Sequence, residues 1–260
     1  MHQNKYTSNL LDELKCSHLS AAATHLDPSI KLFIDQGDLL PDPSLYRRLV
    51  GKLNFLQYTK PALFSSAFKS VPTVSQGPAY DGWFTCFEIL NVCPTQGILL
   101  TNSPNLSLIA FSDSDWATGT FSRRSVTSYF ITLGGCPISW KSKKQPTISL
   151  SSAEAEYRVL RKVVAEISWL VRLLNDLDLS ITTHVPVFCD SQAALHIAKN
   201  LIFHKRIKHI EVDCHYVRDC LSYGLVSLQF MHSFDQLTDI MTKALYGPLH
   251  HTILGKPGVF

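Results

Sequence analysis

Four acidic residues occupy positions from which carboxylates could share one metal site. Asp113 and Asp190 end the apolar runs LIAFSD and VPVFCD, while Glu156 and Asp239 lie in segments with helical periodicity. If the four side chains converge, they repel one another strongly unless cations neutralise them. Mg²⁺ takes carboxylate oxygens, and a pair of such ions activates water against a phosphodiester. The four acids therefore predict a two-ion hydrolytic site, provided that the fold brings them together.

Glu154 and Glu156 lie two residues apart, and helical geometry sends them to different faces. Ser151 and Glu154 match a capping box, which assigns Glu154 to the start of the helix and to its outward face. Glu156 falls roughly 20° from Val163 on the apolar stripe and is predicted to point toward the sheet. The alternative is that Glu156 lies at the solvated end of the stripe or pairs with a lysine.

The other acids also have ordinary structural alternatives. Asp190 is a good N-cap for the helix that follows, Asp113 and Asp115 fit a solvated turn, and Asp239 fits a solvated helix face. Asp115 competes with Asp113 as a ligand, since the two share a face if the strand continues. A second capping box at 233–236 would place Asp239 in the second turn of its helix.

An α/β domain is expected at 105–247, because strand and helix patterns alternate there. Strands are predicted at 106–115, 126–135, 136–144, 184–190 and 225–232, and helices at 153–176, 191–200, 209–224 and 234–245. A Gly-Gly turn joins the second and third strands. Three adjoining strands followed by alternating helices and strands favour a mixed sheet covered by helices.

Residues 1–104 differ from the rest and show helical patterns at 6–15, 44–60 and, more weakly, 79–93; residues 248–260 form a tail. The chain has 260 residues and a net charge of +3, which permits a nucleic-acid partner without requiring one. Seven cysteines without a Cys-x-x-Cys pair favour buried thiols over disulfides or zinc. No secretory signal or membrane-length apolar run is present, so an intracellular, cytoplasmic protein without a membrane partner is expected.

Several segments together resemble the C-terminal part of a copia-type retrotransposon Pol polyprotein, where the reverse transcriptase ends and its ribonuclease H domain follows. They are YRRLVGKLNFLQYT, AFSDSDWA, RRSVTSYFITLGG, ISWKSKKQPTISLSSAEAEYR, FCDSQAALHIAKN, KHIEVDCHYVR and QLTDIMTKAL. The resemblance implies a ribonuclease H-like α/β sheet at 105–247, preceded by a mostly helical remnant of the reverse-transcriptase thumb or connection at 1–104.

By this resemblance, the catalytic and metal-binding residues are Asp113, Glu156, Asp190 and Asp239. The implied reaction is endonucleolytic hydrolysis of the RNA strand of an RNA–DNA hybrid with two Mg²⁺ ions, for which Mn²⁺ is a substitute. For an active element, the resemblance also implies a virus-like particle as the location. His232, after the last predicted strand, is a further candidate for moving a proton.

A hybrid-cleaving enzyme reads duplex shape and needs basic groups for phosphates. Arg123, Arg124, Lys141, Lys143 and Lys144 are predicted to contact nucleic acid, and more basic residues occur at 204–209. Trp116 and Trp140 are expected to fill the core rather than stack on a base.

The sequence also departs from the family pattern. It holds no Tyr-x-Asp-Asp motif, so DNA polymerisation is not expected, and Ser128 stands where the family usually has glycine. The alternative function is therefore a catalytically inert, nucleic-acid-binding remnant of a truncated Pol.

Overall fold

The computed structural model describes residues 2–15, 43–56, 58–60, 90, 97–102, 104–118, 122–181, 184–200 and 211–242. The chain divides into two compact units, one of residues 1–100 with 243–260 and one of residues 101–242. The predicted helix at 79–93 and the basic run at 204–209 lie outside the described residues, apart from the helical Leu90.

The first unit contains two described helices, α1 (Asn4–Glu13) and α2 (Pro43–Leu56), which confirms the predicted helices at 6–15 and 44–60. Tyr6 and Phe55 meet edge to face, with ring centroids 5.1 Å apart. Lys52 forms an ion pair with Glu13. Leu53 is fully buried. These contacts pack α1 against α2.

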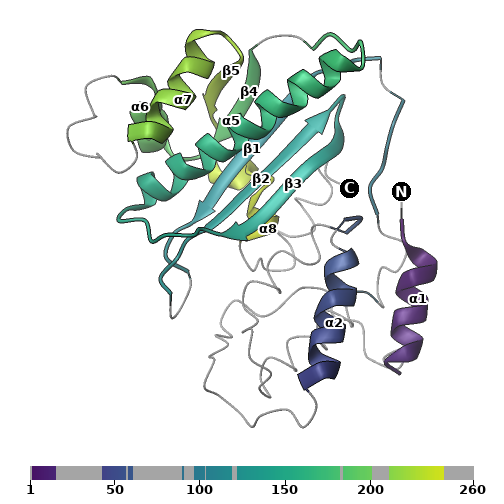
Figure 1. Cartoon of the computed structure of the whole chain (residues 1–260). Coiled ribbons are helices and arrows are strands. Elements are labelled where there is room, and N and C mark those ends of the chain that lie inside the picture. The colour runs from purple at the N-terminus through teal and green to yellow at the C-terminus, as the bar shows by residue number, and fades with distance from the viewer. Residues whose placement is uncertain are drawn as a thin grey trace. The chain divides into compact units, whose positions relative to one another are not determined.

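The second unit is built on a five-stranded mixed sheet in the order β3-β2-β1-β4-β5 (Figure 1). The strands are β1 (Leu108–Asp115), β2 (Val126–Leu133), β3 (Cys136–Lys144), β4 (Val185–Cys189) and β5 (Val226–Phe230). The pairs β1–β2 and β2–β3 are antiparallel, whereas β1–β4 and β4–β5 are parallel. All five predicted strands and the mixed sheet are confirmed.

The turn between β2 and β3 consists of Gly134 and Gly135, with φ values of 58° and 82°. Two successive residues with positive φ match the right-handed twist of a two-residue hairpin, and glycine adopts that conformation without steric cost. The sequence Gly-Gly therefore specifies this connection locally.

Three helices share one face of the sheet: α5 (Ser152–Asp176), α6 (Gln192–Lys199) and α7 (Glu211–Ser222) (Figure 1). The predicted apolar stripe of α5 is buried, and Leu160, Val163 and Ile167 are fully enclosed with Ala110 and Val187 of the sheet. After α7 the chain reverses at Gly224, whose φ is 69°. Burial of this stripe positions the first turn of α5 over the end of β1.

The last described elements lie on the opposite face of the sheet. Ser139 and Ser142 of β3 point to opposite faces because strand side chains alternate. Ser139 Oγ donates to Glu166 of α5 at 2.8 Å, whereas Ser142 Oγ donates to the carbonyl oxygen of Met241 in α8 (Asp239–Thr242) at 2.9 Å.

The predicted helix at 234–245 is wrong over its first turns. A 3-10 turn, η3 (Ser233–Asp235), comes first, and α8 starts only at Asp239. The cause is Gln236, which is fully buried and donates from Nε2 to the carbonyl oxygen of Ser112 at 2.9 Å. Gln236 therefore anchors the segment to β1 instead of completing a capping box.

Two other sequence expectations concern cysteines and membrane spans. Cys136, Cys189 and Cys220 are buried free thiols, as predicted for these three positions. No helix within the described ranges is long and apolar enough to cross a bilayer.

Candidate metal centre

The ends of two parallel strands bring Asp113 and Asp190 to neighbouring positions. Ser112 of β1 lies opposite Cys189 of β4 in the parallel register, and each acid is the next residue in its chain. Asp113 is 1% exposed and belongs to the strand, so the alternative of a solvated turn is wrong for it. Because β1 continues to Asp115, these two aspartates share a face of the strand, as the sequence predicted.

Glu156 lies in the first turns of α5 and points into the protein. Its side chain is buried, and Oε1 accepts a hydrogen bond of 2.8 Å from the backbone N–H of Ser114. The prediction that Glu156 follows the buried stripe is confirmed. Ser114 Oγ is also buried and has no hydrogen-bond partner among the described residues.

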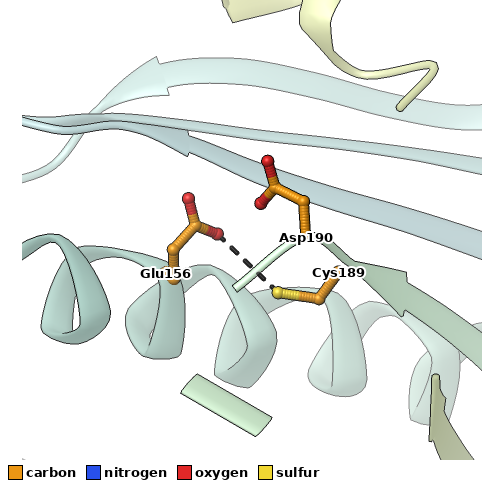
Figure 2. Close-up of side chains that lie close together, drawn as sticks. All are labelled: Glu156, Cys189 and Asp190. Atoms are coloured by element: carbon orange, nitrogen blue, oxygen red, sulfur yellow. Dashed lines mark hydrogen bonds between the residues drawn. The ribbon is translucent and has the colours of Figure 1, made fainter. Parts of the chain in front are cut away.

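Glu156, Cys189 and Asp190 form one group of potential ligand atoms, which all lie within 4.8 Å of one another (Figure 2). Cys189 Sγ faces Glu156 Oε2 at 3.9 Å. Burial and then the charge of Glu156 raise the pKa of the Cys189 thiol, so it stays protonated and serves as a donor. The two carboxylates of this group suit a hard, oxygen-binding cation.

Asp190 is not the N-cap of α6, contrary to the structural alternative considered for it. Ser191 is the N-cap, and its Oγ accepts from the backbone N–H of Ala194 at 3.2 Å. Asp190 Oδ2 instead accepts a hydrogen bond of 2.7 Å from Ser233 Oγ in η3. The Asp190 carboxylate is thus held by a residue 43 positions away and is directed toward Glu156 (Figure 2).

Asp239 begins α8 and is buried, so the alternative of a solvated helix face is wrong. The bond from Gln236 to Ser112 fixes the approach of this segment to β1, next to Asp113. Within the described residues, the group of ligand atoms holds two of the four predicted acids, Glu156 and Asp190. A shared site for all four remains a prediction.

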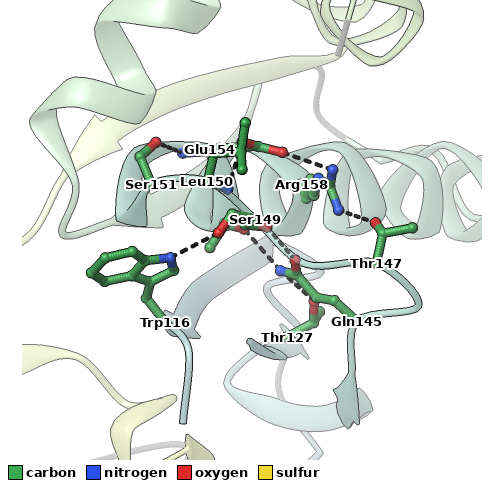
Figure 3. A network of polar contacts seen from close by, with 10 residues as sticks. Trp116, Thr127, Gln145, Thr147, Ser149, Leu150, Ser151, Glu154 and Arg158 are labelled. Carbon is green, nitrogen blue, oxygen red and sulfur yellow. Dashed lines mark hydrogen bonds and ion pairs between the residues drawn. The ribbon is translucent and has the colours of Figure 1, made fainter. Parts of the chain in front are cut away.

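The expectation that Glu154 faces outward is wrong. Ser151 caps α5, and its Oγ accepts from the Glu154 N–H at 3.1 Å, as the capping box predicts. The Glu154 side chain is nevertheless 4% exposed, accepts from the Leu150 N–H at 2.9 Å and pairs with Arg158 at 2.7 Å (Figure 3). The segment before the helix covers this side chain, which a helical wheel cannot represent.

A polar network missed by sequence reasoning holds that covering segment (Figure 3). Gln145 is buried, and its Nε2 donates to the carbonyl oxygen of Ala155 at 3.1 Å, while its Oε1 accepts from Ser149 Oγ at 2.8 Å. Trp116 Nε1 donates to the carbonyl oxygen of Ser149 at 3.1 Å. Trp116 is 47% exposed, so the prediction that it fills the core is wrong, and Trp140 is partly buried.

The lysines of β3 that were predicted to contact nucleic acid do not all lie on the same face of the sheet. Lys141 and Lys143 point to the α5 face of β3, and Lys144 points to the other face. Arg123 and Arg124 are in the segment between β1 and β2, where Arg124 is exposed. His232 is exposed and meets Phe230 edge to face.

The chain resembles three plant transposon polyproteins. It is 36% identical over 248 residues to the retrovirus-related Pol polyprotein from transposon RE2 of Arabidopsis thaliana, a match that covers 94% of this chain and 17% of that protein. For transposon RE1 of the same plant, the identity is 34% over 264 residues, a match that covers 100% of this chain and 18% of that protein. For transposon TNT 1-94 of Nicotiana tabacum, it is 28% over 255 residues, covering 94% and 19%. The chain thus spans less than a fifth of these relatives.

No protein-family model matches the chain. Two solved ribonuclease H structures are similar to parts of it. LC11-RNase H1, isolated from compost, is 16% identical with a TM-score of 0.37, covering 49% of this chain and 84% of that one. The N-terminal RNase H domain of rv2228c from Mycobacterium tuberculosis is 11% identical with a TM-score of 0.38, covering 57% and 96%.

Proposed function

Because the chain belongs to the retrovirus-related Pol polyproteins of copia-type transposons, we propose that its second unit is a ribonuclease H that cleaves the RNA strand of RNA–DNA hybrids. The observation that carries the proposal is the convergence of Glu156 and Asp190, from α5 and the end of β4, within 4.8 Å. A buried carboxylate beside a second one is unfavourable unless a cation or a proton joins them.

The residues present fit a divalent cation. Glu156 and Asp190 offer carboxylate oxygens as ligands, and the unpartnered Ser114 Oγ can bond to a bound water. In the proposed site, Asp113 and Asp239 complete the set that holds two Mg²⁺ ions. Mn²⁺ has similar ligand preferences and is expected to substitute. When bound, such ions supply an activated water and neutralise the leaving oxygen of the phosphodiester.

The protein's own contribution is to hold the carboxylates in place before substrate arrives. The Ser114 N–H fixes one oxygen of Glu156, and the Cys189 thiol lies against the other. Ser233 fixes one oxygen of Asp190. Each acid thus keeps lone pairs for a ligand while its orientation is set by the sheet, which limits the reorganisation needed during reaction.

The experiment that tests this function uses the purified 260-residue chain, a hybrid labelled on its RNA strand, and Mg²⁺. The expected result is internal cleavage of the RNA, no cleavage after chelation, and a loss of at least about a hundredfold in Asp190→Asn, because a metal ligand is removed. Undiminished cleavage in Asp190→Asn, or none in the wild-type protein, would refute the proposal. Salt-sensitive binding of the hybrid without turnover would instead support the inert binding remnant.

A further inference from the structure

The α5 face of the β2–β3 hairpin carries a group of lysines beside the metal centre. Lys141 and Lys143 share their strand face with Ser139, which bonds to Glu166 of α5. Lys162 reaches the same place from the helix, because its Nζ donates to Thr127 Oγ1 of β2 at 3.4 Å. Strand β3 and helix α5 therefore bring three ammonium groups to one face of the sheet.

This lysine group lies near the same end of the sheet as the acids. Thr127 lies opposite Ser114 on one side and opposite Lys143 on the other. Ser114 binds Glu156, so Lys143 is two strand spacings away from that contact, roughly 10 Å. Helical side chains also slant toward the helix N-terminus, which carries the Lys162 ammonium toward the acids.

The three lysines of this group lie in a region of concentrated positive charge. Within the part of the chain that the structure describes, none of the three lysines forms an ion pair. Glu166, one turn beyond Lys162, accepts from Ser139. Burial lowers the pKa of Lys162, and the nearby positive charges lower it further; they belong to Lys141, Lys143, Arg158 and Arg161. An anion would relieve this repulsion.

We propose that Lys162, Lys141 and Lys143 form a phosphate-binding site that holds the nucleic-acid backbone beside the metal centre. The identification of the anion as a nucleic-acid phosphate rests on the proposed function, since the acids at the same edge would act on that backbone. Lys144 points to the other face and is not part of the site. Lys162 was not among the residues that the sequence suggested, because its helical position alone does not bring it to the hairpin.

The test measures hybrid binding, not cleavage, in an Asp190→Asn background of the full chain. Fluorescence anisotropy with a labelled hybrid is followed across a salt titration for Lys162→Gln, for the double variant Lys141→Gln/Lys143→Gln, and for Arg172→Gln as the matched control. Arg172 is an exposed cation of the same helix, ten residues farther along, about 15 Å. At that distance its effect on the lysine site is largely screened at physiological salt.

Lys162→Gln is expected to weaken binding about three- to tenfold and to reduce the slope of log K against log salt by about one, as the loss of a phosphate contact does. The double variant should reduce the slope further. A thermal melt should show Lys162→Gln unfolding at the same or a higher temperature, because repulsion is removed. If Lys162→Gln binds like Arg172→Gln, or if its binding falls only together with its melting temperature, the site is refuted.

The two proposals fail separately. Cleavage by the wild-type protein together with unchanged binding in Lys162→Gln would leave the nuclease standing and remove the phosphate site. Absence of cleavage together with the expected loss of binding and slope would remove the nuclease and keep the site.

Discussion

The backbone N–H of Ser114 donates a hydrogen bond of 2.8 Å to Oε1 of Glu156. These residues are 42 positions apart, and the bond ties the first turns of α5 to β1 immediately after Asp113. Because one oxygen of the Glu156 carboxylate accepts this bond from the strand, its second oxygen is directed toward Cys189 and Asp190 (Figure 2). Helix and strand thus set the geometry of the acidic group together.

The two glutamates of SSAEAEY should respond in opposite ways to amide substitution. Glu156→Gln is expected to lower cleavage by at least about a hundredfold while the protein stays folded, because its amide oxygen can still accept from Ser114. Glu154→Gln is expected to keep cleavage and to lower the free energy of unfolding by about 1–3 kcal/mol, since a buried pair with Arg158 is broken. Cleavage assays and denaturant titrations of both variants check this, and equal losses of activity would contradict it.

The two aspartates that share a face of β1 should also differ. Asp113 is buried beside the acidic group, whereas Asp115 is only partly buried at the strand end. Asp113→Asn is therefore expected to abolish cleavage. It should also reduce the rise in melting temperature caused by Mg²⁺, because a ligand that binds the folded state more weakly stabilises it less. Asp115→Asn should retain both properties. If Asp115→Asn is the inactive variant, the first ligand has been assigned to the wrong residue.

Ser233 should act as a positioning residue for Asp190. Ser233→Ala removes the 2.7 Å bond to Oδ2 and frees the carboxylate to rotate, so the Mg²⁺ concentration needed for half-maximal cleavage should rise by up to about tenfold. Hybrid binding without metal should not change. Ser222→Ala is a suitable control, since Ser222 is an exposed serine at the end of α7. A change in hybrid affinity, with no change in metal dependence, would argue against this role.

The buried Tyr129 should make the free energy of unfolding depend on pH in the alkaline range. Burial, followed by the charge and hydrogen bond of Glu166, raises the pKa of Tyr129 above its ordinary value of 10.0. Above about pH 10 the unfolded chain loses this proton while the folded protein keeps it, so stability falls with pH by up to about 1.4 kcal/mol per unit. Below pH 10, Tyr129 is protonated in both the folded and the unfolded chain, so this loss of stability does not occur there.

Tyr129→Phe should therefore show a shallower loss of unfolding free energy above pH 10 than the wild-type protein. Tyr223→Phe, which changes an 86% exposed tyrosine, should keep the wild-type slope. Denaturant titrations at several alkaline pH values measure both slopes. Parallel curves for Tyr129→Phe and the wild-type protein would show that Tyr129 titrates normally.

Much of the fold follows from local patterns. The Gly134–Gly135 turn, the Ser151 cap and the apolar stripe of α5 each depend on residues close together in the chain, so sequence periodicity and capping rules predict them. The position of Glu156 on the buried stripe also follows from local helical periodicity. Local patterns also indicated where four acids lie, at strand ends and in helices.

Other features were decided by contacts between distant segments. Glu154 is buried because residues 145–150 fold over it, Gln236 bonds to β1 instead of capping a helix, and Lys162 joins the lysines of β3 through Thr127. A helical wheel shows only the direction of a side chain, and not what covers it. The sequence by itself thus determined the elements and their acids, while the tertiary structure decided which of those side chains are enclosed and which meet, because burial depends on segments remote in the chain.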